Sequence, residues 1–248
     1  MFFFVFISGL IIGSFLNVVI YRLDKHQSIW FGRSACPRCR KKIFWYDNIP
    51  VLSFILLGGQ CRHCQKKISL QYPLVEIATA LLLVLLFWRY GLSEQFIVYA
   101  IFSAVLIVIF AYDLKTFQIL DQITIPTMIF AFLVNLYLGM VWWQLILAAI
   151  IGALFFAAQF FISKGKWVGE GDIRLGALMG AMLGWPNILV ALFLAYLIGA
   201  GVGIILLSLK RKEFGSAIPF GPFLTLATFI TLICGKEIMQ WYLNLIYY

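Results

Sequence analysis

The sequence predicts an all-α membrane protein, a polytopic bundle of about eight transmembrane helices with a small cysteine-containing insert. Hydrophobic residues make up 63% of the 248 residues and charged residues only 12%. That composition leaves too little polar surface to cover a soluble domain. The apolar residues also form long runs without charge, from Phe96 to Tyr112 and from Ile123 to Ile162. Because one crossing needs about 20 residues, the second run is long enough for two.

Eight segments are apolar enough to be membrane helices. We expect them at 1–21, 73–89, 96–112, 122–141, 143–162, 172–185, 187–207 and 219–234. The first begins at Met1 without a basic start or a small-residue cleavage site, which favours a retained span over a signal peptide. The sixth has 14 residues, about 21 Å as a helix, and is shorter than the hydrocarbon core. It therefore either thins the bilayer or starts in a protein-lined cavity.

The basic residues predict the orientation of these spans. If the N-terminus faces outward, 17 of the 19 Lys and Arg residues fall in cytoplasmic segments, and only Arg89 and Lys236 lie outside. Basic residues sort to cytoplasmic loops, so the net charge of +9 reflects topology and we expect no nucleic-acid partner. The chain then divides into a first transmembrane helix (1–21), a cytoplasmic insert (22–72) and a membrane-embedded domain (73–248).

Small residues recur four apart in several spans, which is typical of close packing between membrane helices. The pairs and triplets are Gly9 and Gly13; Gly176, Gly180 and Gly184; and Gly199 and Gly203. We expect most of these glycines to serve packing alone.

The insert contains two CxxC knuckles, formed by Cys36 and Cys39 and by Cys61 and Cys64. Four thiolates at this spacing can close a tetrahedral zinc site, and four protein ligands leave no open position for catalysis. We therefore predict a structural Zn²⁺. Two disulfides are the alternative, which a reducing cytoplasm disfavours. His63 lies inside the second knuckle and is a less suitable ligand.

Two acids lie at ends of predicted spans on the same side of the membrane. Asp113 ends the third span and Asp172 begins the sixth. Two facing carboxylates cannot both ionise cheaply, so one keeps its proton, and such a pair can activate water and polarise a peptide carbonyl. Gly169 and Gly171 flank Asp172 and would let a substrate backbone approach closely. We predict an aspartate pair, Asp113 and Asp172, as the catalytic residues.

Each acid also has a simpler interpretation. Asp172 could cap a helix, and Asp113 could be a solvated loop acid beside Lys115. Asp121 lies only eight residues after Asp113 and competes with it. Glu76 is an acid within a span and could be a structural partner or line the site. Spacing alone leaves these alternatives open.

Taken together, the motifs resemble those of the bacterial type IV prepilin peptidases, the bifunctional leader peptidase/N-methyltransferases. They occur in the family's order over nearly the whole chain: GSFLN at 13–17, the two CxxC knuckles with DNIP at 47–50, ISxxYPLVE at 68–76, GxGDxRL at 169–175 and IPFGPF at 218–223. The resemblance implies catalysis by Asp113 and Asp172. One departure is Leu120, where the family usually has proline before Asp121, and it affects the expected loop geometry.

The resemblance also implies the substrates, the second activity and the location. The substrates would be prepilins or pseudopilins in the bilayer of the bacterial inner membrane, cleaved at its cytoplasmic face. The second activity would methylate the new N-terminus from S-adenosylmethionine, although no glycine-rich loop in the sequence explains donor binding. Which prepilins are cut, and whether they serve pili, secretion or DNA uptake, does not follow from the sequence.

Two other classes of function fit the composition. A transporter with a zinc-stapled cytoplasmic cap could use Glu76, Asp113 and Asp172 as ion or proton ligands. Transporters often contain inverted repeats, and the sequence has no such repeat. An assembly scaffold would not need carboxylates at two helix ends on one membrane face.

Overall fold

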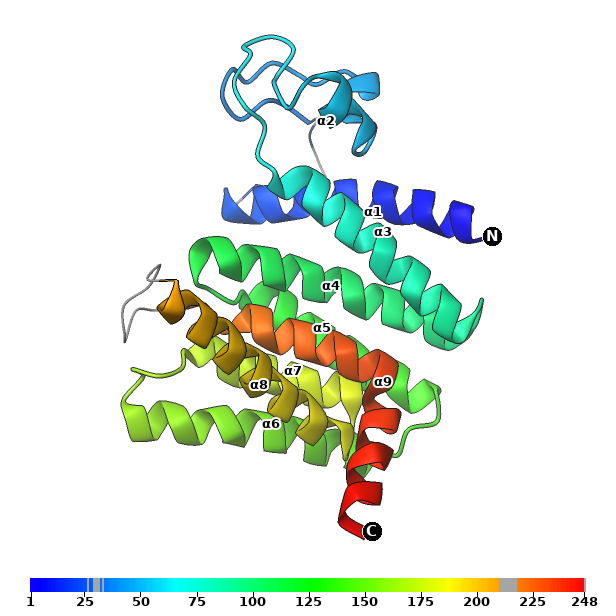
Figure 1. Ribbon diagram of the computed structural model, residues 1–248, viewed down its shortest axis with the longest axis vertical. Helices are drawn as coiled ribbons and strands as arrows, with labels where there is room; N and C mark the ends of the chain where they lie inside the picture. The colour runs from blue at the N-terminus through cyan, green and yellow to red at the C-terminus, as the bar shows by residue number, and fades with distance from the viewer. Residues whose placement is uncertain (26, 29–31, 33, 210–217, 248) are drawn as a thin grey trace. The chain divides into compact units, whose positions relative to one another are not determined.

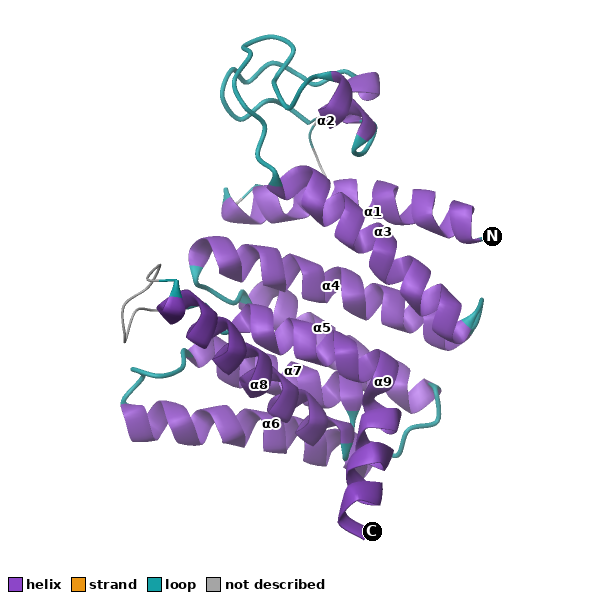
Figure 2. Ribbon diagram, in the orientation of Figure 1, coloured by secondary structure: helices purple, strands orange, loops and turns teal. Residues whose placement is uncertain are grey.

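The computed structural model describes residues 1–25, 27, 28, 32, 34–209 and 218–247. Apart from two isolated β-bridges, the regular structure of these residues is helical (Figure 2). The α-helices are α1 (Phe2–Asp24), α2 (Leu52–Leu56), α3 (Gln71–Tyr90), α4 (Glu94–Thr116), α5 (Asp121–Tyr137), α6 (Trp142–Ser163), α7 (Glu170–Leu183), α8 (Asn187–Ser208) and α9 (Gly221–Tyr247), with a 3₁₀ turn, η1 (Trp45–Asn48).

Each of the eight predicted spans is a helix, so the prediction of an all-α polytopic membrane protein is confirmed. Six helices in the described part of the chain are long and apolar enough to cross a bilayer: α1, α3, α4, α6, α8 and α9. The other two, α5 and α7, have 17 and 14 residues. The predicted number of transmembrane helices, eight, is therefore approximate.

The chain folds as two compact units, Met1–Ala111 and Tyr112–Tyr248. In the first unit α1 packs closely against α3 (Figure 1). A Cβ on Gly9 would lie 2.5 Å from the Cα of Ala80, and one on Gly13 would lie 2.6 Å from the Cα of Glu76. Only glycine allows this approach, so the predicted packing role of these two residues is confirmed.

In the second unit α7 is the central helix. It packs mainly against α6 and α5, and nine of its 14 residues are buried. Gly176 and Gly180 lie directly against backbone carbonyl groups of Gly152 and Ala148 on α6. Because neighbouring helices surround α7, it does not have to match the bilayer thickness by its own length.

The expectation that Gly184 only packs helices is wrong. Gly184 follows the last residue of α7 with a φ of +67°, and its N–H bonds to the carbonyl oxygen of Gly180 at 2.8 Å. A residue with a Cβ is strained at that φ. A Cβ there would also meet the side chain of Met140. This glycine is needed for the turn that ends α7.

Candidate active site and candidate metal centre

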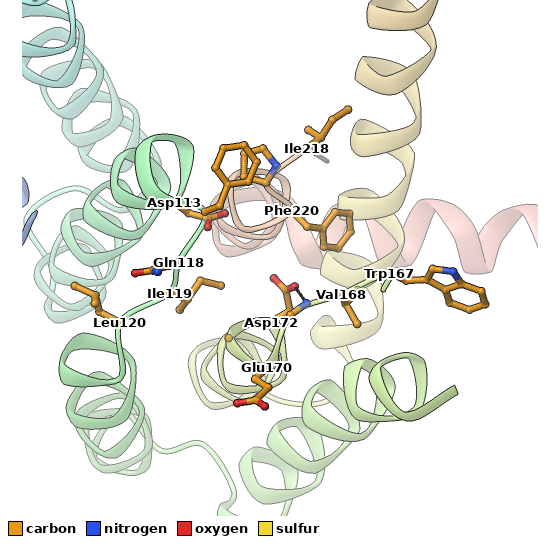
Figure 3. A pocket seen from close by; sticks show the side chains of 14 residues that line it. Asp113, Gln118, Ile119, Leu120, Trp167, Val168, Glu170, Asp172, Ile218 and Phe220 are labelled. Atoms are coloured by element: carbon orange, nitrogen blue, oxygen red, sulfur yellow. Dashed lines mark hydrogen bonds between the residues drawn. The ribbon is translucent and has the colours of Figure 1, made fainter. Parts of the chain in front are cut away.

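Both predicted catalytic aspartates belong to the second unit and are buried. Asp113 lies in the last turn of α4 and its residue is 4% exposed, and Asp172 lies in the first turn of α7 and is 7% exposed. The two carboxylates are close enough to act on each other electrostatically. Figure 3 shows that they come from different helices and reach toward the same space.

That space is a pocket of about 370 Å³. Its lining comes from the three connections α4–α5, α6–α7 and α8–α9. The lining residues are Asp113, Phe117, Gln118, Ile119, Leu120, Trp167, Val168, Gly169, Glu170, Gly171, Asp172, Ile218, Pro219 and Phe220. In an up-and-down bundle alternate connections lie at the same end, which explains how segments about 50 residues apart meet here. All four predicted site residues of this region line the pocket.

Backbone N–H groups hold the two carboxylates. The N–H of Gly169 donates to Oδ2 of Asp172 at 2.9 Å, so the helix-capping alternative for Asp172 is also realised. The N–H of Gly221, at the start of α9, donates to the carboxylate of Asp113. Each acid is thus oriented by a helix N-terminus, where the unpaired N–H groups favour negative charge.

The two neighbouring acids do not join this pair. Asp121 is not among the lining residues and accepts a hydrogen bond from Arg174 instead. That contact ties the start of α5 to the first turns of α7. Glu170 lines the pocket, but its side chain is 69% exposed and points away from Asp172 (Figure 3).

Gly221 had no predicted role of its own, although it lies in the IPFGPF segment. A Cβ on this residue would lie 2.5 Å from Oδ2 and 3.0 Å from Cγ of Asp113. Only the absence of a side chain lets the start of α9 reach the carboxylate. The proximity of this segment to Asp113 depends on helix packing, so no local pattern in the sequence could reveal it.

Gly169 and Gly171 differ in their surroundings. A Cβ on Gly171 would lie 2.9 Å from the Cβ of Ile119, whereas a Cβ on Gly169 would meet nothing closer than 3.8 Å. Gly171 therefore permits close approach of the chain's own α4–α5 connection. Their predicted part in substrate approach remains a prediction.

The four knuckle cysteines form one cluster in the insert of the first unit. Their Sγ atoms all lie within 4.8 Å of one another, and those of Cys36 and Cys64 are 3.9 Å apart. A tetrahedral Zn²⁺ with Zn–S bonds of about 2.3 Å separates its sulfurs by about 3.8 Å, so the cluster fits such an ion. None of the four is in a disulfide. Backbone N–H groups of Cys64 and His63 lower the pKa of Cys61 to about 7, whereas burial and the neighbouring cysteines raise the pKa of Cys64 to about 11.

The two knuckles have the same backbone conformation. In the first knuckle, the N–H of Cys36 donates to the carbonyl oxygen of Lys41 at 3.0 Å. In the second, the N–H of Cys61 donates to the carbonyl oxygen of Lys66, also at 3.0 Å. Arg40 and Gln65, each four residues after the first cysteine, both have positive φ, 58° and 55°. The repeat CxxCxKK is readable in the sequence at 36–42 and 61–67.

An ion pair connects the second knuckle to the segment between the knuckles. Nε of Arg62 donates to Oδ2 of Asp47 at 2.9 Å, and a terminal nitrogen donates to Oδ1 at 2.7 Å. The Arg62 hydrogen bonds lower the pKa of Asp47. His63 is not in the cysteine cluster and instead packs at a tilt on Phe44, with ring centroids 5.9 Å apart.

Comparison with known proteins decides the family. The model of the bacterial peptidase A24 N-terminal domain matches residues 7–90, and that of the type IV leader peptidase family matches residues 100–204. The prepilin leader peptidase/N-methyltransferase of Aeromonas salmonicida is 36% identical over 98% of this chain and 94% of that protein. The chain belongs to the type IV leader peptidase family.

Other members of the family are nearly as similar. The prepilin leader peptidase/N-methyltransferase of Pseudomonas putida is 34% identical over 94% of this chain and 90% of that protein, and that of Pseudomonas aeruginosa is 33% identical over 95% and 91%. No solved structure matches this chain. The leader peptidase match contains Asp113 and Asp172, and the N-terminal match contains the four cysteines and Glu76. Nothing in the comparisons supports the transporter alternative.

Proposed function

We propose that the chain is a membrane endopeptidase that removes the leader peptides of prepilins and pilin-like proteins by means of Asp113 and Asp172. The observation that carries the proposal is the shared pocket: two buried carboxylates from the ends of different helices, in a chain of the leader peptidase family. A structural acid would not need a second acid beside it in a cavity.

In this proposal the pair holds one proton between its two carboxylates. The ionised member takes a proton from a water molecule, which attacks the scissile carbonyl carbon. The protonated member donates its proton to the carbonyl oxygen. The N–H groups of Gly169 and Gly221 keep the two carboxylates in place. The pocket of about 370 Å³ has room for water and a short extended segment, not for a helix.

We propose that the pocket faces the cytoplasm. The three connections that line it all fall among the segments where the basic residues are concentrated. A substrate anchored in the same membrane would present its leader junction at this depth. The bond has to be extended for cleavage, because helical carbonyl groups are hydrogen-bonded, and Gly169 and Gly171 lie on the pocket wall where an extended strand would pass.

We propose that Cys36, Cys39, Cys61 and Cys64 hold a structural Zn²⁺, as the donor set and the sulfur separations fit. When bound, the ion would tie the two knuckles together. The names of the relatives imply a second activity, N-methylation of the new N-terminus with S-adenosylmethionine as the donor. We extend this activity to the present chain.

Co-expression with a candidate prepilin, followed by mass measurement of its N-terminus, tests both activities. Cleavage shortens the protein by its leader, and methylation adds about 14 Da. Uncleaved precursor in the presence of abundant wild-type enzyme, across a panel of prepilins, would count against the proposal.

A further inference from the structure

An apolar segment, residues 49–59, lies between the two knuckles of the insert. It contains α2 and has no charged residue, and Ser53 is its one polar side chain. Four of its large apolar residues are between 40% and 76% exposed: Ile49, Leu52, Ile55 and Leu56. So many exposed apolar side chains in so short a segment indicate a surface that meets an apolar partner.

The contacts of Glu76 place this segment beside the membrane helices and not beyond their ends. Oε2 of Glu76 on α3 accepts the N–H of Val51 at 2.8 Å, and the side chain of Ser14 on α1 is hydrogen-bonded to the same carboxylate. A Cβ on Gly13 would lie 2.6 Å from the Cα of Glu76, so the two residues are at one level. Gly13 precedes Asp24, the last residue of α1, by about three turns, or about 16 Å. Val51, one side chain and one hydrogen bond away from that level, therefore lies beside the apolar part of α1.

The polar groups of the segment are paired in the way that a position in hydrocarbon requires. The N–H groups of six residues bond to carbonyl oxygens within the segment: Leu52, Ser53, Ile55, Leu57, Gly58 and Gly59. The hydroxyl of Ser53 donates to the carbonyl oxygen of Ile49 at 2.6 Å. Val51 precedes α2, and its N–H is bonded to Glu76 instead. The buried acid of α3 thus supplies an acceptor that water would supply to a loop in solution.

A cavity of about 780 Å³ lies between the segment and α1. Its walls are mostly apolar: five apolar side chains of α1, from Ile7 to Val18, line it together with Ile49, Pro50 and Leu52 of the segment. Arg22, near the end of α1, also lines it, and its guanidinium donates to the carbonyl oxygens of Ser28 and Gly32 at 3.1 and 2.6 Å. Apolar walls with a cation near the helix end match a phospholipid, whose acyl chain is apolar and whose phosphate lies at the interface.

The residues that flank the segment suit the headgroup layer. Trp45 lies shortly before it and is 82% exposed, and tryptophan is enriched where a membrane meets water. The two knuckle turns carry four exposed lysines: Lys41, Lys42, Lys66 and Lys67. Basic side chains next to a membrane helix attract anionic lipid. An apolar segment between an aromatic residue and basic turns is the arrangement expected of a segment that enters a bilayer from its surface.

We propose that residues 49–59 form a re-entrant element that enters the lipid bilayer beside α1. Lipid acyl chains cover Ile49, Leu52, Ile55 and Leu56 and fill the cavity between the segment and α1. The knuckles with their lysines stay at the headgroups, so the cysteine cluster is held against the membrane surface. The hydrogen bond from Val51 to Glu76 fixes the irregular start of the element to α3. This inference does not depend on the protease proposal.

The test uses the full chain, one copy in each lipid nanodisc, with a fluorescent amino acid incorporated at one position at a time. Lipids that carry a nitroxide on the acyl chain or on the headgroup quench the fluorescence from two depths. Leu56 is the test position, Leu81 in the middle of α3 is the membrane reference, and Lys66 is the surface reference; all three are exposed. At Leu56 and Leu81 we expect acyl-chain quenching to exceed headgroup quenching by about twofold, since the hydrocarbon of one leaflet is about 15 Å thick. The order should reverse at Lys66.

A charge in the segment provides a second measurement. Ile55→Glu should lower acyl-chain quenching at Leu56 below headgroup quenching, because a charged side chain is costly in hydrocarbon. Ile55→Phe is the matched control and should leave the quenching unchanged. Equal quenching in the two variants would count against a position in the bilayer.

The quenching pattern separates lipid from the other possible surroundings of the segment. Quenching at Leu56 by the headgroup nitroxide alone, or by neither lipid, would overturn the proposal, because the segment would then lie at the surface, in water or under protein. Protection of Leu56 from the acyl-chain nitroxide by an excess of prepilin would assign the surface to the apolar helix of the substrate instead. None of these measurements requires cleavage, so an inactive wild type with the expected quenching would count against the protease proposal alone.

Discussion

The two units handle buried carboxylates in different ways. In the second unit Asp172 accepts a backbone N–H from Gly169, and in the first Glu76 accepts one from Val51. The surroundings of the two acids differ. A second carboxylate, Asp113, shares the pocket with Asp172, whereas Glu76 lies where α3 packs against Gly13 of α1. Two facing carboxylates can share one proton, so that one acts as the base and the other as the acid. The second carboxylate is what suits the pocket of the second unit to the proposed acid–base chemistry.

Removing one acid of the pair should have the largest effect. Asp113→Asn or Asp172→Asn should each lower the cleavage rate by three orders of magnitude or more, since general acid–base catalysis contributes about 10²–10⁴-fold and the pair acts as a unit. Cleavage of a prepilin by membranes with matched enzyme levels measures this. Asp121→Asn is the control, because Asp121 pairs with Arg174 outside the pocket. Near-normal turnover in either variant would remove that aspartate from the mechanism.

Loss of the metal should affect the first unit. Purified protein should contain about one equivalent of zinc by elemental analysis, and Cys36→Ser or Cys64→Ser should abolish it. Because the insert has little core of its own, it should then become the first site of limited proteolysis. Cys234→Ser should keep the metal, since Cys234 is outside the cluster. Metal-free wild-type protein would contradict the assignment.

Gly221→Ala should reduce cleavage by about 10- to 100-fold, with the effect mainly on kcat. The new Cβ would displace the Asp113 carboxylate from its position at the start of α9, and a displacement of about 1 Å can cost about 10²-fold. Gly201→Ala is the matched control, since nothing lies within 4 Å of its Cβ position on α8. Equal rates for the two variants would show that Gly221 does not position Asp113.

Gly171→Ala should have a smaller effect, a several-fold loss of cleavage. Its Cβ would lie 2.9 Å from the Cβ of Ile119, so the α4–α5 connection has to shift to accommodate it. Gly169→Ala should be tolerated, because its Cβ has space. Kinetics with a peptide spanning the leader junction would compare the two. A loss greater for Gly169→Ala than for Gly171→Ala would reverse this interpretation of the pocket wall.

The smallest effect should come from Arg174. Its ion pair with Asp121 is formed by side chains that are 41% and 46% exposed, and exposed pairs contribute about 0–1 kcal/mol. Arg174→Gln should therefore lower the Tm by no more than a few degrees, measured in detergent at matched concentration. A much larger loss of stability would mean that the link between α5 and α7 is essential for the unit.

Local patterns account for most of what could be predicted. Long apolar runs predicted a helix in each of the eight segments, because hydrophobic length alone specifies a crossing. The CxxC spacing predicted the cysteine cluster, because each knuckle is a short local turn whose two sulfurs already face one ion. Because so few acids exist in the chain, the candidates for the pair could be reduced to Asp172 with either Asp113 or Asp121.

Tertiary structure alone decided which groups meet. Residue types and spacing could not decide whether Asp113 or Asp121 lies beside Asp172. Helix packing places Asp113 in the pocket, and Asp121 forms an ion pair with Arg174 instead. The same packing brought Gly221 against Asp113 and Val51 against Glu76. Gly184 belonged to a glycine series with a four-residue spacing, yet its φ of +67° made it a turn residue. The physical reason is that hydropathy and spacing act along one segment, whereas these contacts depend on how separate helices are rotated against one another.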